Sequence, residues 1–195
     1  MQLYRKVQAV EKAFRALGRE VEAFQEAAGV SCIRGCGACC TYEEVLASTL
    51  ELLPLAYHLY RHGRATELFE SLSSSDVGNV CVFLDRDEDD SMPGRCTVHP
   101  HRGLICRLFG FSGVADRRGR VHYAACRLIK EHDRERFPAV ETAVGEGRLS
   151  IPVGARYYLM LNAVDPSLMA YHPINIAIRK SIETVLGYYS YRRGR

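Results

Sequence analysis

The stretch that decides the fold reads Cys32-Ile33-Arg34-Gly35-Cys36-Gly37-Ala38-Cys39-Cys40. It places four thiols within nine residues. Thiolate sulfur binds soft or borderline ions, so an all-sulfur ligand set selects zinc or an iron–sulfur cluster over magnesium or calcium. Gly35 and Gly37 suit a loop that wraps an ion, because glycine allows unusual backbone angles and close approach of the backbone. The stretch therefore predicts a metal site.

Four further cysteines follow at wider spacing: Cys81, Cys96, Cys106 and Cys126. Three of them stand next to an arginine, as Arg95-Cys96, Cys106-Arg107 and Cys126-Arg127. A nearby cation stabilises thiolate and offsets the charge of a ligand set. Eight thiols are enough for two four-ligand sites, and the sequence leaves their partition open. Taken singly, each of these four cysteines could equally be a small buried hydrophobic residue.

The composition is that of an ordinary globular protein. The chain has 195 residues, 47% hydrophobic and 25% charged, with a net charge of +3 that demands no polyanionic partner. This length suggests one domain, and the composition excludes a disordered or collagen-like chain. Eight cysteines are too few for a small disulfide scaffold of this length. We find no apolar signal core and no membrane-length apolar run, so we expect a cytoplasmic protein with reduced thiols and no membrane partner.

A helix is predicted to begin directly after the cysteine stretch. Thr41 is a favourable N-cap, and Glu44 three residues later would complete a capping box. Cys39 and Cys40 would then lie at the positive end of the helix dipole, which favours thiolate or an anionic cluster. Because the two cysteines are adjacent, their side chains are expected to diverge, so that they serve separate centres or only one of them is a ligand.

An amphipathic pattern covers the N-terminal segment. Its apolar residues are spaced alternately four and three apart: Leu3, Val7, Val10, Phe14, Leu17, Val21, Phe24 and Ala28. This spacing predicts a helix over residues 2–28, with Gly29 as its stop. The helix either packs on its own domain, which we favour, or forms a coiled-coil arm that makes a homodimer through residues 2–28.

The other segments predict more helix and a little sheet. Helices are expected at 41–62 with a kink at Pro54, and at 65–72, 137–147, 154–164 and 173–188. Two short strands that pair with each other are expected at 81–84 and 96–98, and a hairpin is expected at 112–125 that turns at Gly119.

These elements define a mainly α fold with one or two small β-hairpins, in a single compact domain organised around a cysteine-ligated metal centre. Residues 1–29 form the N-terminal amphipathic helix, 30–127 the cysteine-rich metal-binding domain, and 128–195 a C-terminal helical segment that packs on the same domain. Long strands do not alternate with helices, which argues against a Rossmann or barrel architecture.

The cysteine motifs resemble those of the CxxCxxCC family of zinc- or iron-chelating domains. Three blocks carry the resemblance: Cys36-Gly37-Ala38-Cys39-Cys40 preceded by Cys32; Cys81-Val82-Phe83-Leu84; and Cys96-Thr97-Val98-His99-Pro100-His101-Arg102-Gly103-Leu104-Ile105-Cys106-Arg107-Leu108-Phe109. The third block keeps the family's C-x-[IV]-Y-x-x-R-P-x-x-C-R-x-F spacing, with His99 in place of Tyr and Gly103 in place of Pro. Gly110 stands where Pro often follows the Phe.

The resemblance covers about residues 30–127 and implies chelation of zinc or iron. The family is described with eight cysteines, and Cys126 would complete that set. Some members of the family are flagellin lysine methylases, so the resemblance also raises an SAM-using enzyme as an alternative.

A competing motif is the spacing Cys32-x-x-x-Cys36-x-x-Cys39, which matches the cluster-binding motif of radical-SAM enzymes. That motif follows the first strand of a large β/α barrel, whereas here a long helix is predicted before it. The chain is also too short and too poor in strands for such a barrel.

Three weaker motifs have simpler interpretations. The acidic run 85–90 lacks the glycine and glutamate of a calcium loop, which favours a solvated loop. His58 and His62 lie four apart, as zinc ligands can, but two exposed helix histidines are the preferred interpretation. His99 and His101 could replace a cysteine in a mixed site, although enough thiols are available without them.

The hypothesis from the sequence is a metal-binding protein that holds zinc or iron, with a slight preference for an iron–sulfur cluster. Its first-rank ligands are Cys32, Cys36, Cys39 and Cys40, and its second-rank ligands are Cys81, Cys96, Cys106 and Cys126. The alternatives are a redox or SAM-using enzyme built on an iron–sulfur centre, and a structural zinc module that binds protein or nucleic acid. The sequence contains no recognisable pair of nucleophile and general base that would identify a catalysed reaction. Nucleic acid is the less favoured partner, because the aromatic and basic segment 188–195 is more simply a frayed terminus.

Overall fold

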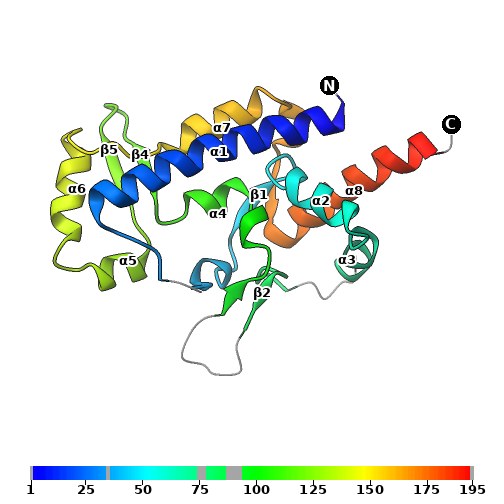
Figure 1. Ribbon diagram of the computed structural model, residues 1–195, viewed down its shortest axis with the longest axis horizontal. Helices are drawn as coiled ribbons and strands as arrows, with labels where there is room; N and C mark the ends of the chain where they lie inside the picture. Colours follow the sequence, from blue (N-terminus) through cyan, green and yellow to red (C-terminus); the bar gives the residue numbers. More distant parts are fainter. Residues whose placement is uncertain (1, 34–35, 74–77, 87–93, 194–195) are drawn as a thin grey trace.

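The structure is a computed structural model, and it describes residues 2–33, 36–73, 78–86 and 94–193 (Figure 1). Gly35, Ser74, Ser75 and most of the acidic run at 85–90 lie outside the described residues. Within them the fold is mainly helical, with three two-stranded antiparallel sheets. This confirms the predicted mainly α class with small β-hairpins, while its organisation around a cysteine-ligated metal centre stays a prediction.

The N-terminal helix α1 (Leu3–Ala28) is present as predicted. It stops at Gly29, whose φ of 65° is left-handed and whose N–H donates to the carbonyl of Gln25. Every residue of the apolar stripe is buried except Val21, which is half-buried. The stripe therefore packs inside its own chain, as the favoured interpretation predicts. The homodimer through residues 2–28 stays a prediction.

Two clusters of buried side chains lie along α1. The larger cluster joins the first half of α1 to α2 (Leu53–Arg61), α7 (Gly154–Asn162) and α8 (Ile174–Arg193). The smaller cluster joins its last turns, through Phe24 and Ala28, to α5 (Arg127–His132), α6 (Phe137–Gly145) and β5 (Val121–Ala124). Figure 1 shows α1 running along one side of the molecule. Helices α2, α3 (Ala65–Ser71) and α8 lie at one end, and α5, α6 and the hairpin of β4 (Ser112–Ala115) and β5 lie at the other.

The predicted helix start at Thr41 is wrong. Thr41 instead follows the 3₁₀ turn η1 (Ala38–Cys40), and its Oγ1 donates to the carbonyl of Ala38 at 2.8 Å. The chain then forms strand β1 (Leu46–Ser48), which pairs antiparallel with β6 (Tyr171–Pro173). The capping-box signal is local, whereas β1 depends on a partner strand more than a hundred residues away, so the local signal was misleading.

The helices on either side of β1 and β6 differ from prediction mainly at their ends. Helix α2 starts at Leu53 with Pro54 in its first turn, and α3 (Ala65–Ser71) follows as predicted. Pro173 ends β6 and does not begin a helix, so α8 starts one residue later, and it runs beyond the predicted end to Arg193. Helix α8 packs against α2, α3, β1 and β6.

The cysteine-bearing middle of the chain contains short elements. Strands β2 (Leu84–Asp85) and β3 (Arg95–Cys96) pair with Leu84 opposite Cys96, so the predicted pairing is confirmed although both strands are shorter and Cys81 lies before β2. The 3₁₀ turn η2 (His99–His101) and helix α4 (Leu104–Leu108) follow. The hairpin of β4 (Ser112–Ala115) and β5 turns through Gly119, at φ 79°, as predicted. A third 3₁₀ turn, η3 (Pro166–Leu168), precedes β6.

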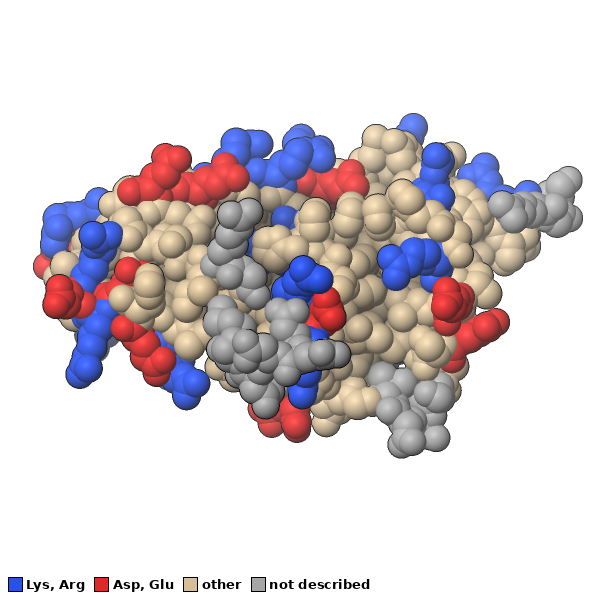
Figure 2. Space-filling model, turned by 60° about the horizontal axis from the view of Figure 1, so that its bottom comes forward, with Lys and Arg blue, Asp and Glu red and all other residues tan. Residues whose placement is uncertain are grey.

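On the face drawn in Figure 2, lysine and arginine side chains lie interspersed with aspartate and glutamate side chains, and much of the remaining described surface is uncharged. No helix within the described residues is both long enough and apolar enough to cross a membrane.

Candidate metal centre

The turn that carries Cys36, Cys39 and Cys40 is held by its own backbone. The N–H of Cys36 donates to the carbonyl of Ile33 at 3.1 Å, and the N–H of Cys40 donates to that of Gly37 at 2.8 Å. Cys40 is buried, with 8% of its surface exposed, while Cys36 and Cys39 are half-buried. The short 3₁₀ turn therefore directs the sulfur of Cys40 into the molecule.

The β2–β3 hairpin packs directly on this turn. Gly37 has no side chain, which allows Gly94 and Leu84 of the hairpin to approach its backbone closely. The φ of Gly37 is −102°, so glycine is needed here for space and not for a left-handed conformation. This contact brings Cys96 on β3 next to the cysteine turn.

Cys81 is held next to the cysteine turn by hydrogen bonds from two backbone N–H groups. Its N–H donates to the carbonyl of Cys40 at 3.4 Å. The next residue, Val82, donates its N–H to Oδ1 of Asn175, a buried side chain on α8, at 2.9 Å. The Asn175 amide also donates to the carbonyls of Gly78 and Val80, at 2.7 and 2.8 Å. Asn175 thus fixes the segment before β2 against α8.

The thiols of Cys39, Cys40, Cys81 and Cys96 form one group, which we call the inner thiol group. The Cys40 thiol interacts with the other three sulfurs as a hydrogen-bonding partner, and these interactions raise its pKa far above the usual value. The same interaction lowers the pKa of Cys39 to about 7 and that of Cys96 to about 6, and it also lowers the pKa of Cys81. The adjacent Cys39 and Cys40 therefore meet in one group, which corrects the expectation that their side chains diverge.

Backbone N–H groups also point at the inner thiol group. The sulfur of Cys81 accepts a hydrogen bond from the N–H of Phe83, and that of Cys96 accepts one from Val98, and each bond contributes to lowering the pKa of its thiol. Hydrogen bonds to the charged form stabilise thiolate. The folded backbone is thus arranged to favour ionised sulfur at these two positions.

Cys106 lies beside the inner thiol group on α4. Burial raises the pKa of its thiol to about 12, and the charges of Cys81, Cys39 and Glu51 add to this effect. Helix α4 is anchored at its start by Glu51, whose Oε1 accepts the N–H of Ile105 at 3.0 Å. Its other oxygen accepts the N–H and the hydroxyl of Ser48, at 3.1 and 2.9 Å. Glu51 is fully buried and so ties α4, which carries Cys106, to β1.

Cys32, Cys36 and Cys126 form an outer thiol group. Partial burial raises the pKa of the Cys32 thiol to about 11, and the neighbouring sulfurs of Cys36, Cys126 and Cys39 raise it further. Cys126 is the N-cap of α5, and its sulfur accepts the N–H of Ile129 at 3.4 Å. A cysteine does lie at the start of a helix, but it is Cys126 on α5 and not Cys39 or Cys40.

The arginines that neighbour cysteines in sequence are engaged elsewhere. Arg95 pairs with Asp85 at 3.1 Å, and Arg127 pairs with Glu131 at 3.5 Å. Arg107 stacks on the ring of Phe14, 4.6 Å from its centroid, and donates to the carbonyl of Arg102 at 2.9 Å. Among the described residues, Arg102 is a cation whose field reaches sulfurs of both thiol groups, and its sequence position alone did not point to this role.

Sequence reasoning also missed Glu51 and Asn175, which position α4 and Cys81. Glu51 was detectable as a charged residue inside the apolar run 50–56, where a side chain facing the core must find hydrogen-bond donors. Asn175 occupies a similar polar position among the apolar residues 174–178.

The histidine motifs come together outside the thiol groups. The ring of His58 stacks on that of His101, with centroids 3.8 Å apart, and lies 4.2 Å from that of His62. His99 is exposed at the start of η2. His58 and His62 are thus neighbours at the end of α2, as their spacing predicts, but His58 is half-buried and not exposed. Their third neighbour, His101, comes from the third cysteine block.

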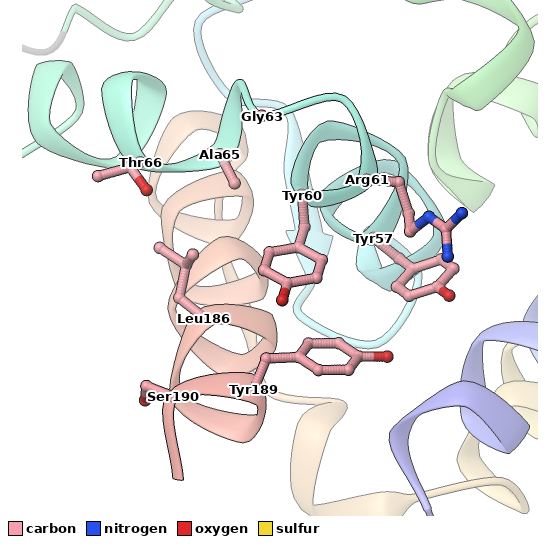
Figure 3. A pocket seen from close by; sticks show the side chains of 9 residues that line it. All are labelled: Tyr57, Tyr60, Arg61, Gly63, Ala65, Thr66, Leu186, Tyr189 and Ser190. Carbon is pink, nitrogen blue, oxygen red and sulfur yellow. The ribbon is translucent and has the colours of Figure 1, made fainter. Parts of the chain in front are cut away.

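A pocket of about 820 Å³ lies away from the cysteines, between α2, α3 and α8 (Figure 3). The rings of Tyr57, Tyr60 and Tyr189 face into it, and Tyr60 and Tyr189 stack at 4.5 Å. Tyr189, which was predicted to lie in a frayed terminus, is therefore packed on α2. No cysteine or histidine is among the described residues that line the pocket, so it is separate from the candidate metal centre.

All eight cysteines are free thiols. As the side chains lie, no three histidine, cysteine or acidic side chains within the described residues form a preformed metal site. The donor set nevertheless fits zinc or iron, since the inner thiol group is all sulfur and receives backbone N–H donors. These features define the class as a small, mainly helical protein built around a cluster of reduced cysteines.

Comparison with known families places the chain within that class. The chain belongs to the CxxCxxCC family, whose description reads "Putative zinc- or iron-chelating domain" and whose model matches residues 31–137. The matched range contains all eight cysteines. No curated protein and no solved structure matches the chain.

Proposed function

We propose that the chain binds zinc or iron through the thiolates of Cys39, Cys40, Cys81 and Cys96. The observation that supports this most directly is the interaction of Cys40 with three other sulfurs, which come from the cysteine turn, the segment before β2 and strand β3. Four sulfurs suffice for a tetrahedral zinc ion or for the four iron atoms of a cubane cluster.

Cys32, Cys36 and Cys126 form the second ligand set in this proposal. Cys106 lies next to the inner thiol group and completes the eight thiols that the sequence assigns to metal binding. A cytoplasmic location, where thiols stay reduced, accords with eight free cysteines.

One of the arguments for preferring an iron–sulfur cluster over zinc no longer holds. It depended in part on a helix starting at Thr41, and the structure has a 3₁₀ turn and a strand there instead. A zinc ion closed by four thiolates would stabilise the fold and leave no open position, whereas an iron–sulfur cluster would supply electron transfer. Both agree with an all-sulfur donor set.

The alternatives from the sequence receive no specific support. Within the part of the chain that the structure describes, no observation favours a redox or SAM-using enzyme over a binding protein. The aromatic C-terminal segment, which suggested nucleic acid, has Tyr189 packed against Tyr60 and Tyr57.

The test is the metal content of the full chain after anaerobic purification, measured with a sulfide assay and a visible spectrum. Cys40→Ser and Cys39→Ser should lower bound metal and the melting temperature together, because serine oxygen is a poor substitute for thiolate. The matched control is Ala38→Ser, which changes the same turn without removing a sulfur. A brown protein with iron and sulfide identifies a cluster, and a colourless one with stoichiometric zinc identifies a zinc site. Unchanged metal content in both cysteine variants would contradict the proposal.

A further inference from the structure

Arg102 has a buried N–H group for which the described residues supply no acceptor. It lies between Cys96 and Cys106 in the sequence, immediately after η2, and is half-buried. Its Nη1 is 3.5 Å from the carbonyl oxygen of Cys106. Its Nε is enclosed and has no hydrogen-bond partner in the described structure. A buried N–H group without an acceptor costs free energy in the folded state. We therefore infer that this N–H group has an acceptor in the metal-bound protein.

No sulfur accepts from the Nε–H in the described structure, but the charge of Arg102 reaches several of the thiols. The positive charge of Arg102 acts on Cys39 and Cys96 of the inner thiol group, on Cys106 beside it, and on Cys32 of the outer group. Four thiolates around a divalent ion carry an excess of negative charge, and burying that charge is unfavourable without a nearby cation. Arg102 is placed to reduce this cost at sulfurs from both groups.

Arg95 provides the contrast, because it directly precedes Cys96 in the sequence. Its side chain is 65% exposed and its guanidinium pairs with Asp85. Its charge is therefore largely compensated and screened at the surface. Sequence adjacency suggested Arg95 as one of three cations beside cysteines, whereas burial and the unpaired Nε favour Arg102.

We propose that Arg102 is the positioning residue of the metal centre: its guanidinium offsets the charge of the metal-bound thiolates, and its Nε–H donates to one of their sulfurs. This inference rests on the function proposed above. Guanidinium is suited to the role because it stays charged and presents several N–H donors in one plane.

The test compares Arg102→Gln, Arg102→Lys and the control Arg95→Gln in the full, reduced chain under anaerobic conditions. Zinc affinity is measured by competition with a chromophoric chelator, and cobalt(II) reports thiolate ligation through its charge-transfer absorption. We expect Arg102→Gln to weaken zinc binding roughly 10- to 100-fold, as is typical for residues that support metal ligands. We also expect this variant to shift the cobalt band. Arg102→Lys should recover part of the affinity because it keeps the charge, and Arg95→Gln should match the unmodified chain.

The outcomes separate this inference from the proposed function. Equal zinc affinity and equal cobalt spectra in Arg102→Gln and Arg95→Gln would refute the role of Arg102 and leave the metal site standing. Absence of zinc and cobalt binding by the unmodified chain would refute both. If Arg102→Gln fails to fold, as judged by circular dichroism, the Lys variant decides: partial affinity supports the proposal, and the affinity of the unmodified chain refutes a role for the Nε–H.

Discussion

Gly37 and Gly94 lie in direct backbone contact, where the cysteine turn meets the β2–β3 hairpin. A β-carbon added to Gly37 would stand 2.3 Å from the carbonyl oxygen of Gly94. That distance is too short for any side chain, and the obstacle is backbone that cannot rotate away. The approach of Cys96 to Cys39 and Cys40 therefore depends on a glycine at position 37.

Gly37→Ala should separate the hairpin from the cysteine turn. We expect a loss of about 1–3 kcal/mol in unfolding free energy, as for other overpacked sites, together with a loss of bound metal. The control is Gly18→Ala on α1, where an added β-carbon meets nothing within 4 Å and helix propensity should add roughly 0.5–1 kcal/mol. Chemical denaturation and elemental analysis measure both effects. Full metal content in Gly37→Ala would show that the contact does not assemble the site.

Replacing Glu51 should destabilise the folded protein, because its buried carboxyl group accepts backbone hydrogen bonds. Glu51→Ala leaves the N–H groups of Ser48 and Ile105 without an acceptor, at roughly 1–3 kcal/mol for each buried donor. Glu51→Gln keeps one acceptor and should cost less. The control Glu44→Ala, an exposed residue of the incorrectly predicted capping box, should change stability by no more than about 0.5 kcal/mol.

The pH dependence of stability gives a second test of Glu51. Burial raises the pKa of its carboxyl above 4.5, although hydrogen bonds from Ile105 and Ser48 oppose the shift. The folded state therefore binds this proton more tightly than the unfolded state, so stability falls as the pH rises from 4.5 towards the folded pKa. Glu51→Gln should remove this fall when denaturant midpoints are compared across that range. An unchanged slope would show that the carboxyl does not titrate in the folded protein.

The histidine stack should make the protein less stable in mild acid. Burial lowers the pKa of His58, and the neighbouring His101, His62 and Arg64 lower it further. The unfolded chain then binds more protons, so stability declines as the pH falls through the usual histidine range near 6.5. His58→Gln should flatten this decline between pH 7.5 and about 5.5, a window set around the ordinary histidine pKa. His132→Gln, an exposed histidine at the end of α5, is the control and should keep the decline.

The apolar stripe of α1 should support the fold of a single chain. Leu17 is fully buried in the larger core cluster, so Leu17→Ala should cost about 2–5 kcal/mol of stability without changing the molecular mass in sedimentation. Arg15→Ala, on the exposed face of the helix, is the control. A dimer that dissociates in Leu17→Ala while the fold keeps its stability would favour the arm interpretation instead.

Local patterns predicted much of the fold. The stripe of α1, the stop at Gly29 and the hairpin at Gly119 were readable because their signals lie within one element. Strand β1 was missed because its partner Tyr171–Pro173 is remote in sequence, and the nearby Thr41 and Glu44 imitated a helix start. Element type thus followed from sequence where the cause was local.

The candidate site shows the same division. The eight cysteines were identified from their number and spacing, but their grouping was not. That grouping depends on contacts between distant residues, such as Gly37 with Gly94 and Asn175 with Val82. The nearby positive charge also depends on the fold: sequence adjacency suggested Arg95, Arg107 and Arg127, whereas folding brings the charge of Arg102 near Cys96.

The most direct test of the account is X-ray absorption at the metal edge of the full chain, purified anaerobically. The account predicts zinc or iron with a first coordination shell of sulfur only, at about 2.3 Å for zinc. A shell of oxygen or nitrogen, or a purified chain that holds neither zinc nor iron, would contradict it.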